Sequence, residues 1–126
     1  CFIIPLIIPT MVKTIKHLFK NEINIKGMCH ITGGGFFENV PRMLKKGQGV
    51  EIDVKSFPRP KIFDLIKEKG NIEEKEMYNV FNMGIGFIMA VHKDDVELVL
   101  NKLNEINEKA YVIGKVTNSG EVDLKW

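Results

Sequence analysis

The sequence contains very little cysteine. Only Cys1 and Cys29 occur among its 126 residues, which is too few for a disulfide framework or for a four-ligand zinc site. We therefore expect no metal site on this chain and a reducing, cytoplasmic environment for it.

An excess of charge of one sign is also lacking. Lysine and arginine together number 18 and aspartate and glutamate 16, so the formal net charge at pH 7 is only +2. So small a charge gives no reason to expect a nucleic-acid or membrane partner. Pro5 and Pro9 interrupt the apolar start of the chain, so no apolar run reaches the roughly 20 residues of a membrane-spanning helix.

The chain begins at Cys1 within that apolar run and lacks the basic leading region of a signal peptide. We expect a fragment whose partner surface lies upstream, with part of its core missing. Its 126 residues are nevertheless enough for one domain with its own core.

Helices and strands alternate along the rest of the chain. Apolar spacing predicts helices at residues 11–20, 61–69, 71–80 and 94–106. Alternating or continuous apolar runs predict strands at residues 27–32, 50–54, 87–92, 111–116 and 122–126. The turn Asn118-Ser119-Gly120 is predicted to join the last two strands as a hairpin. The pattern indicates an α+β domain in which helices pack on a mixed sheet.

Some helices carry more detailed predictions. The buried face of the helix at 61–69 is predicted to consist of its apolar residues: Ile62, Phe63, Leu65 and Ile66. Asn71 and Glu74 have the spacing of a capping box, with Asn in place of the usual Ser or Thr, and predict that the next helix opens at Asn71. Thr10 is the expected N-cap of the helix at 11–20.

Three consecutive glycines, Gly33, Gly34 and Gly35, separate the strand at 27–32 from a short helical pattern. Glycine permits positive φ and close approach of a ligand to the backbone, and the first N–H groups of a helix lack intrahelical partners. The junction can therefore bind a phosphate or carboxylate, and Arg42 can close over the same anion. The simpler interpretation, that the glycines form only a tight connection, stays open.

The stricter nucleotide-binding motifs are absent. Glu38 stands where a dinucleotide-binding G-x-G-x-x-G turn needs its third glycine, and no G-x-x-x-x-G-K-[ST] sequence occurs. Anion binding by the glycine loop is thus a hypothesis that follows from backbone chemistry and not from a motif match.

Two long motifs, in the same order and spacing, resemble one known family. They are His30-Ile31-Thr32-Gly33-Gly34-Gly35-Phe36-Phe37-Glu38-Asn39-Val40-Pro41-Arg42 and Phe81-Asn82-Met83-Gly84-Ile85-Gly86, with Gly70-Asn71 and Glu76-Met77-Tyr78 between them. Through these blocks the chain resembles the C-terminal half of the phosphoribosylformylglycinamidine cyclo-ligase (AIR synthetase) family, from about residue 6 to residue 116.

This resemblance implies an enzyme of purine biosynthesis. The family uses ATP and Mg²⁺ to close the imidazole ring of formylglycinamidine ribonucleotide, which gives aminoimidazole ribonucleotide, ADP and phosphate. It implies a homodimer of two-domain subunits, in which an N-terminal domain holds most of the ATP–magnesium site. Residues 1–126 would form the single C-terminal, substrate-covering domain, a three-layer α/β/α fold with a mixed sheet that is partly ferredoxin-like. Because the ATP-binding half is absent, we expect this chain alone to be inactive.

Site residues are carried over from the matching motifs. The resemblance assigns the glycine loop, with Thr32 before it, to the phosphates of the substrate or nucleotide. Asn39 and Arg42 would flank the loop as an amide donor and a fixed positive charge. His30 is the candidate for proton transfer during ring closure, since its unperturbed pKa lies near neutrality. A hydrogen-bonded structural histidine is the alternative.

A second turn, formed by Asn82, Gly84 and Gly86, is expected to lie beside the first and to contact the same ligand. The alternative for these residues is a purely structural bend between a helix and a strand.

Two other classes of function stay open. Related ATP-using enzymes with the same two-domain plan include thiamine-phosphate kinase, selenophosphate synthetase, formylglycinamidine ribonucleotide synthetase and a hydrogenase maturation factor, although residues 38–42 favour the cyclo-ligase. The other class is a non-catalytic binding module, in which the apolar start, residues 2–8, is an interaction strand.

Overall fold

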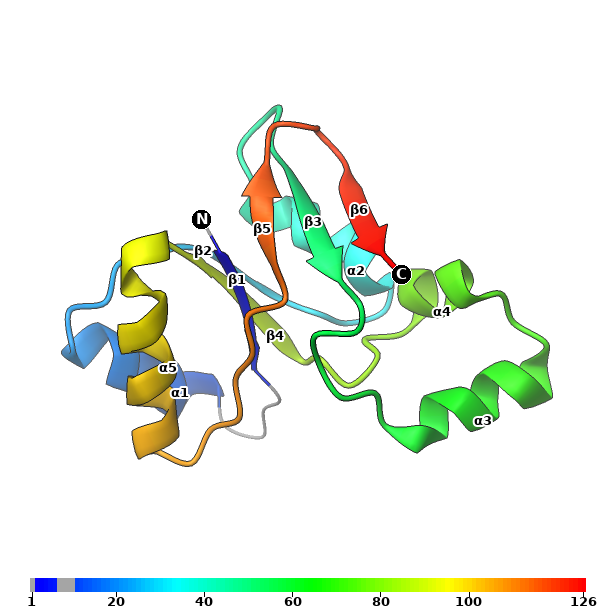
Figure 1. Cartoon of the computed structure of the whole chain (residues 1–126), viewed down its shortest axis with the longest axis horizontal. Helices are drawn as coiled ribbons and strands as arrows, with labels where there is room; N and C mark the ends of the chain where they lie inside the picture. Colours follow the sequence, from blue (N-terminus) through cyan, green and yellow to red (C-terminus); the bar gives the residue numbers. More distant parts are fainter. Residues whose placement is uncertain (1, 7–10) are drawn as a thin grey trace.

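The computed structural model describes residues 2–6 and 11–126 and contains one six-stranded sheet with helices packed on it (Figure 1). The strands are β1 (Phe2–Leu6), β2 (Ile25–His30), β3 (Gly49–Asp53), β4 (Phe87–Val91), β5 (Gly114–Thr117) and β6 (Val122–Lys125). The helices are α1 (Met11–Lys20), α2 (Gly35–Asn39), α3 (Lys61–Gly70), α4 (Glu74–Val80) and α5 (Val96–Glu105), with the short 3-10 helices η1 (Val40–Met43) and η2 (Lys93–Asp95).

The strand order is β2-β4-β1-β5-β3-β6. Its first four strands are antiparallel: β4 pairs with β2 and β1, and β1 pairs with β5. Helix α1 connects β1 to β2, and α5 connects β4 to β5. This is the arrangement of a ferredoxin-like βαββαβ unit. The parallel pairing of β3 with β6 makes the whole sheet mixed, so the predicted α+β fold with a partly ferredoxin-like mixed sheet is confirmed.

The central strands β1 and β4 are buried on both faces. Successive side chains of a strand point to opposite sides of the sheet, so each of these strands contributes to two apolar clusters. One apolar cluster joins β1 and β4 to helices α1 and α5: Ile4, Leu18, Phe87, Met89, Val91, Val99 and Leu103. A second cluster joins the same strands to α2, η1 and α4: Ile3, Phe36, Val40, Met77, Tyr78, Ile88 and Ala90. The sheet therefore lies between two helical layers, and the continuous apolar run of β4 reflects this double burial.

The predicted terminal hairpin is wrong. β3 lies between β5 and β6, antiparallel to β5 and parallel to β6. The start of β3 fits closely against the segment before β6, since a Cβ on Gly49 would lie 2.3 Å from the Glu121 carbonyl oxygen. Turn residues favour a reversal of the chain, but they do not decide whether the two strands pair directly or around a third.

Helix α3 occupies the predicted range, but its predicted buried face is wrong. Ile62 is 54% exposed and Leu65 49% exposed, while Phe63 and Ile66 are only half-buried against the second cluster. Figure 1 shows α3 beside α4 and away from the sheet. Apolar periodicity identifies one side of a helix, but it does not show how much of the protein covers that side.

The predicted capping box is also wrong. Asn71 has φ +48° and follows the last turn of α3, where its N–H donates to the Glu68 carbonyl oxygen at 3.3 Å. Asparagine tolerates this left-handed conformation better than most residues. Asn71 therefore ends one helix, and α4 begins only after Glu73. The predicted N-cap Thr10 lies outside the described residues.

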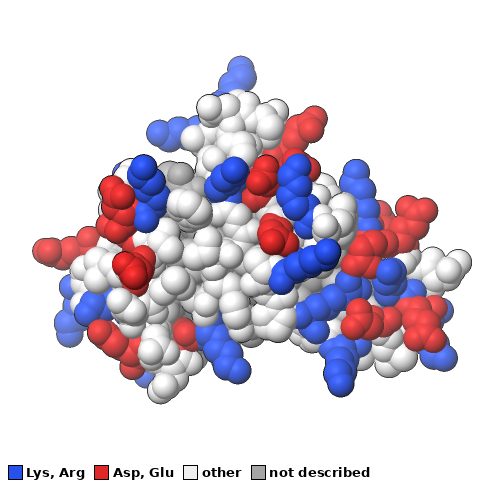
Figure 2. All heavy atoms as spheres, viewed as in Figure 1, with Lys and Arg blue, Asp and Glu red and all other residues white. Residues whose placement is uncertain are grey.

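Basic and acidic side chains are interspersed on the surface. On the face in Figure 2 they surround a central area of uncharged residues and do not gather into a region of one sign. Within residues 2–6 and 11–126, no helix has the length and apolar character needed to cross a membrane.

Candidate functional site

The turn that follows β2 lies beside the turn that precedes β4. His30 is paired with Phe87, and one step further the Ile31 N–H donates to the Gly86 carbonyl oxygen at 2.9 Å. The strand pairing thus brings the glycine loop and residues 82–86 together, as the sequence predicts.

The three glycines of the loop differ in their surroundings. Gly34 has φ +92° and Gly35 has φ +55°, and the Gly35 N–H donates to the Thr32 carbonyl oxygen at 3.1 Å. A Cβ on Gly35 would lie 2.1 Å from the Tyr78 carbonyl oxygen, whereas a Cβ on Gly33 would meet nothing within 4 Å. Gly35 therefore allows α2 to pack on α4, and Gly33 faces open space.

Asn39 holds the loop from inside. Its side chain is buried, and its Nδ2 donates to the carbonyl oxygens of Gly35 at 2.8 Å, Gly33 at 3.3 Å and Thr32 at 3.4 Å. These bonds fix the path of the backbone, so the amide positions the loop. That the Asn39 amide also donates a hydrogen bond directly to a phosphate stays a prediction.

Arg42 lies at the mouth of the loop. Its Nη2 is 2.7 Å from Glu38 Oε1, and its Nη1 donates to Asn39 Oδ1 at 3.3 Å. More than half of the Arg42 side chain is exposed, so the guanidinium can reach a ligand. The partner Glu38 was not predicted, although its position four residues before Arg42 is the spacing of a helical ion pair.

His30 lies on the other side of the sheet from Arg42. Cys29 and Ile31 belong to the cluster under α2 and α4, so His30, between them, points to the opposite face. Helix η1, which carries Arg42, packs on the Cys29 face: Val40 belongs to the same cluster, and a Cβ on Gly27 would lie 2.8 Å from the Met43 carbonyl oxygen. Burial raises the pKa of the Cys29 thiol to about 11, partly offset by the positive charge of Arg42. The exposed His30 side chain is therefore not brought together with Arg42, and its catalytic role stays a prediction.

The second turn is held by its own bonds. Asn82 Oδ1 accepts from the Gly84 N–H at 3.0 Å, and the Asn82 carbonyl oxygen accepts from Ile85 N–H at 2.9 Å. Gly84 has φ +90°, and a Cβ there would lie 2.7 Å from Pro60 Cδ. This geometry favours the structural interpretation of Asn82 and Gly84, and their contact with a ligand stays a prediction.

An ion-pair cluster between α3 and α4 was not predicted. The Arg59 guanidinium pairs with Glu74 and, at 2.9 Å, with Asp64, and Lys67 lies 2.5 Å from Glu74. Burial alone would raise the pKa of Glu74, but hydrogen bonds and attraction from Lys67 and Arg59 hold it below its usual value. Because Arg59 and Glu74 are distant in sequence and on separate elements, no local spacing could have revealed the pair.

Glu74→Gln is expected to destabilise the fold at neutral pH and to have less effect in acid. The pKa of Glu74 in the folded chain is below its usual 4.5, so its carboxylate adds stability that is fully present above pH 4.5. That stability is lost as the pH falls through the folded-state pKa. Urea unfolding at pH 7, 4.5 and 3 measures the difference in unfolding free energy between wild type and variant. Glu73→Gln, at an exposed neighbour, is the control. If the difference for Glu74→Gln is the same at pH 3 as at pH 7, the charged form of Glu74 does not stabilise the fold.

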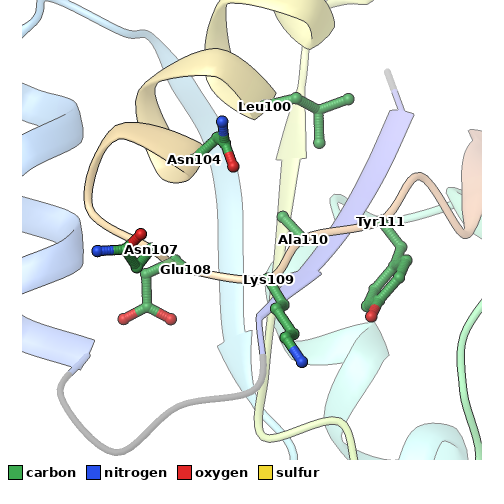
Figure 3. A pocket seen from close by; sticks show the side chains of 7 residues that line it. All are labelled: Leu100, Asn104, Asn107, Glu108, Lys109, Ala110 and Tyr111. Atoms are coloured by element: carbon green, nitrogen blue, oxygen red, sulfur yellow. The ribbon is translucent and has the colours of Figure 1, made fainter.

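A separate hollow of about 480 Å³ lies at the end of α5 (Figure 3). It is lined by Leu100 and Asn104 of α5 and by residues 107–111. None of the predicted site residues lines it. In the described ranges, no group of three or more His, Cys, Asp or Glu side chains is arranged to hold a metal ion.

The fold and the loop agree with one protein family. Residues 5–126 match the family model described as "AIR synthase related protein, C-terminal domain", and the chain belongs to this family.

Among its relatives are enzymes named phosphoribosylformylglycinamidine cyclo-ligase. That of Oceanobacillus iheyensis is 54% identical over 105 residues, which are 83% of this chain and 31% of the relative. That of Bacillus pumilus is 56% identical over 92 residues, 73% of this chain and 27% of the relative. That of Thermoanaerobacter pseudethanolicus is 53% identical over 108 residues, 86% and 32% of the two chains. The chain thus spans about a third of the length of these curated relatives.

Solved structures with the same fold are more distant in sequence. HypE of E. coli, a hydrogenase maturation protein, superposes with a TM-score of 0.65 at 24% identity, over 90% of this chain and 35% of HypE. Thiamine-monophosphate kinase of Stenotrophomonas maltophilia K279a gives a TM-score of 0.56 at 8% identity, over 78% of this chain and 30% of the kinase. At these identities the likeness shows a shared fold.

Proposed function

We propose that this chain is the C-terminal part of a phosphoribosylformylglycinamidine cyclo-ligase. Such an enzyme closes the imidazole ring of formylglycinamidine ribonucleotide with ATP and forms aminoimidazole ribonucleotide in purine biosynthesis. The observation that carries the proposal is 54% identity over 105 residues to an enzyme of that name, against 24% and 8% for structures with other names.

In this proposal residues 1–126 form a single domain that covers the substrate. ATP and Mg²⁺ are held mainly by a separate N-terminal domain, which also builds a homodimer in the cytoplasm. The chain alone is then inactive, and ring closure requires the longer polypeptide.

The glycine loop is the proposed phosphate-binding element. The N–H groups of Gly33 and Gly34 follow the end of β2, the space beside Gly33 is open, and Asn39 fixes their backbone from behind. Helix α2 has only five residues, so its dipole adds little. The main attraction comes from Arg42, whose planar guanidinium can donate two parallel hydrogen bonds to a phosphate.

His30 is proposed to move a proton during ring closure. Because it points to the opposite face of β2 from Arg42, a substrate that contacts both must pass around the end of the strand, where Thr32 and Gly86 lie. Binding by the loop and proton transfer by His30 would then act on different parts of one molecule.

Arg42→Ala is expected to lower kcat/KM of the longer enzyme at least tenfold, about 1.4 kcal/mol of transition-state stabilisation. The loss follows from removing the charge that faces the phosphate. The measurement is steady-state ring closure with formylglycinamidine ribonucleotide and ATP. Lys46→Ala, which removes an exposed charge from the next turn, is the control and should leave the rate unchanged. Unchanged kinetics in Arg42→Ala would remove Arg42 from the site.

A substrate panel separates the cyclo-ligase from enzymes that share only the fold. The longer polypeptide would be assayed with formylglycinamidine ribonucleotide, thiamine phosphate and selenide, each with ATP. Turnover of either of the last two, without ring closure, would replace the proposed reaction. Absence of any ATP-dependent turnover would favour the non-catalytic binding module.

A further inference from the structure

The Glu38 carboxylate lies against Gly34 of the glycine loop. A Cβ built on Gly34 would fall 2.1 Å from Glu38 Oε2 and 2.7 Å from its Cδ, so this carboxylate fills the space that the missing side chain leaves. Its other oxygen, Oε1, is 2.7 Å from Arg42 Nη2. One negatively charged group of the chain itself therefore lies against Gly34 and also pairs with Arg42.

We propose that Glu38 is an internal counter-ion of this site, which competes with incoming anions for Arg42, so that only an anion that binds Arg42 and the loop more strongly than a carboxylate does displaces it. The inference rests on the proposed function, because it takes the glycine loop and Arg42 as the phosphate-binding element. It adds a specificity-determining residue, Glu38, that neither the family match nor the relatives assign.

A bound anion can replace Glu38 as the partner of Arg42 at little cost in stability. Both side chains are about 60% exposed, and exposed ion pairs contribute little to stability because water and salt screen them. Asn39 is different, since it is buried and its Oδ1 also accepts from Arg42 Nη1 at 3.3 Å. When the Glu38 side chain rotates away, Asn39 still holds the guanidinium at the mouth of the loop.

This competition favours phosphate monoesters over carboxylates. A carboxylate ligand offers Arg42 the same charge and geometry as Glu38, so exchange gains little. A phosphate monoester near neutral pH carries up to two negative charges and three acceptor oxygens, and it can bond Arg42 and the loop N–H groups together. The expected ligand is therefore the phosphate monoester group of a ribonucleotide. Simple carboxylates are expected to bind weakly.

The test is an NMR titration of this chain with inorganic phosphate and with acetate at constant ionic strength, following the amide signals of Gly33 and Gly34. The variants are Glu38→Gln, which keeps the size of the side chain, and Arg42→Ala, with Glu76→Gln as a control at an exposed glutamate of α4. We expect Glu38→Gln to tighten phosphate binding roughly twofold to fivefold, the effect of removing one exposed charge beside another. Acetate carries a single charge, so its binding should tighten by the same factor or a smaller one and stay weaker than that of phosphate. Glu76→Gln should behave as wild type.

Three outcomes would overturn different statements. If wild type and Glu38→Gln bind phosphate equally while Arg42→Ala loses binding, the counter-ion role of Glu38 is wrong and the proposed site stands. If phosphate shifts neither glycine in any variant, the loop is not a phosphate site and the proposed role of the loop fails with it. If phosphate shifts both glycines equally in wild type and in Arg42→Ala, Arg42 is not part of the site, and the counter-ion role of Glu38 fails with it.

Discussion

Replacing Gly35 by alanine is expected to lower the free energy of unfolding by about 3 kcal/mol, the combined effect of a positive φ and an overpacked contact. Its φ is +55°, and the added Cβ would lie 2.1 Å from the Tyr78 carbonyl oxygen and 2.9 Å from the Asn79 backbone. Those atoms belong to the end of α4 and cannot rotate away as a flexible side chain would. Urea unfolding monitored by circular dichroism measures the change.

Gly33→Ala is the matched control within the same loop. A Cβ at Gly33 meets nothing within 4 Å and requires no positive φ, so the variant should unfold within about 0.5 kcal/mol of wild type. Equal stability of the two variants would mean that α2 does not pack against α4 as described.

Phe36→Ala is expected to cost about 4 kcal/mol of unfolding free energy, the usual range for a fully buried phenylalanine. Phe36 is 0% exposed, and its ring lies 6.2 Å from that of Phe57 and 5.6 Å from that of Tyr78, centroid to centroid. Truncation leaves a cavity beside two aromatic side chains, those of Phe57 and Tyr78, behind the glycine loop. The same urea titration measures the loss.

The neighbouring residue provides the comparison. Phe37 is only half-buried, and its ring contacts the Lys75 ammonium at 5.6 Å. Phe37→Ala should therefore cost less than half as much as Phe36→Ala. If the two substitutions cost the same, Phe36 is not the central side chain of the layer under the loop.

Sequence patterns predicted correctly the burial of elements that the rest of the protein covers evenly, such as β4. β4 lies within the sheet and is covered on both faces, so its apolar run could only be a central strand. α3 has the same strength of apolar pattern, but Ile62 and Leu65 are half exposed because α3 lies away from the six strands that the structure describes. Local spacing records which side of a helix is apolar and carries no information on what covers it.

Contacts between segments far apart in the sequence were the second feature that local patterns did not predict. β5 and β6 are separated by an ordinary turn, yet β3 lies between them, and this choice depends on the whole sheet. At the site, the Glu38–Arg42 ion pair could have been predicted from the spacing of the two residues, which is that of a helical pair. The separation of His30 from Arg42 could also have been predicted. Cys29 and Ile31 are apolar and face the core, so His30, between them in the strand, faces the other side.

The position of β1 also has a consequence for biosynthesis. During translation this strand is made before the segments that form both of its neighbours, β4 and β5, which come from the last third of these 126 residues. Two strand edges and an apolar segment must therefore wait until β4 and β5 have been made. Such late closure slows folding and exposes nascent chains to aggregation, so productive expression should depend on chaperones that protect this strand during translation.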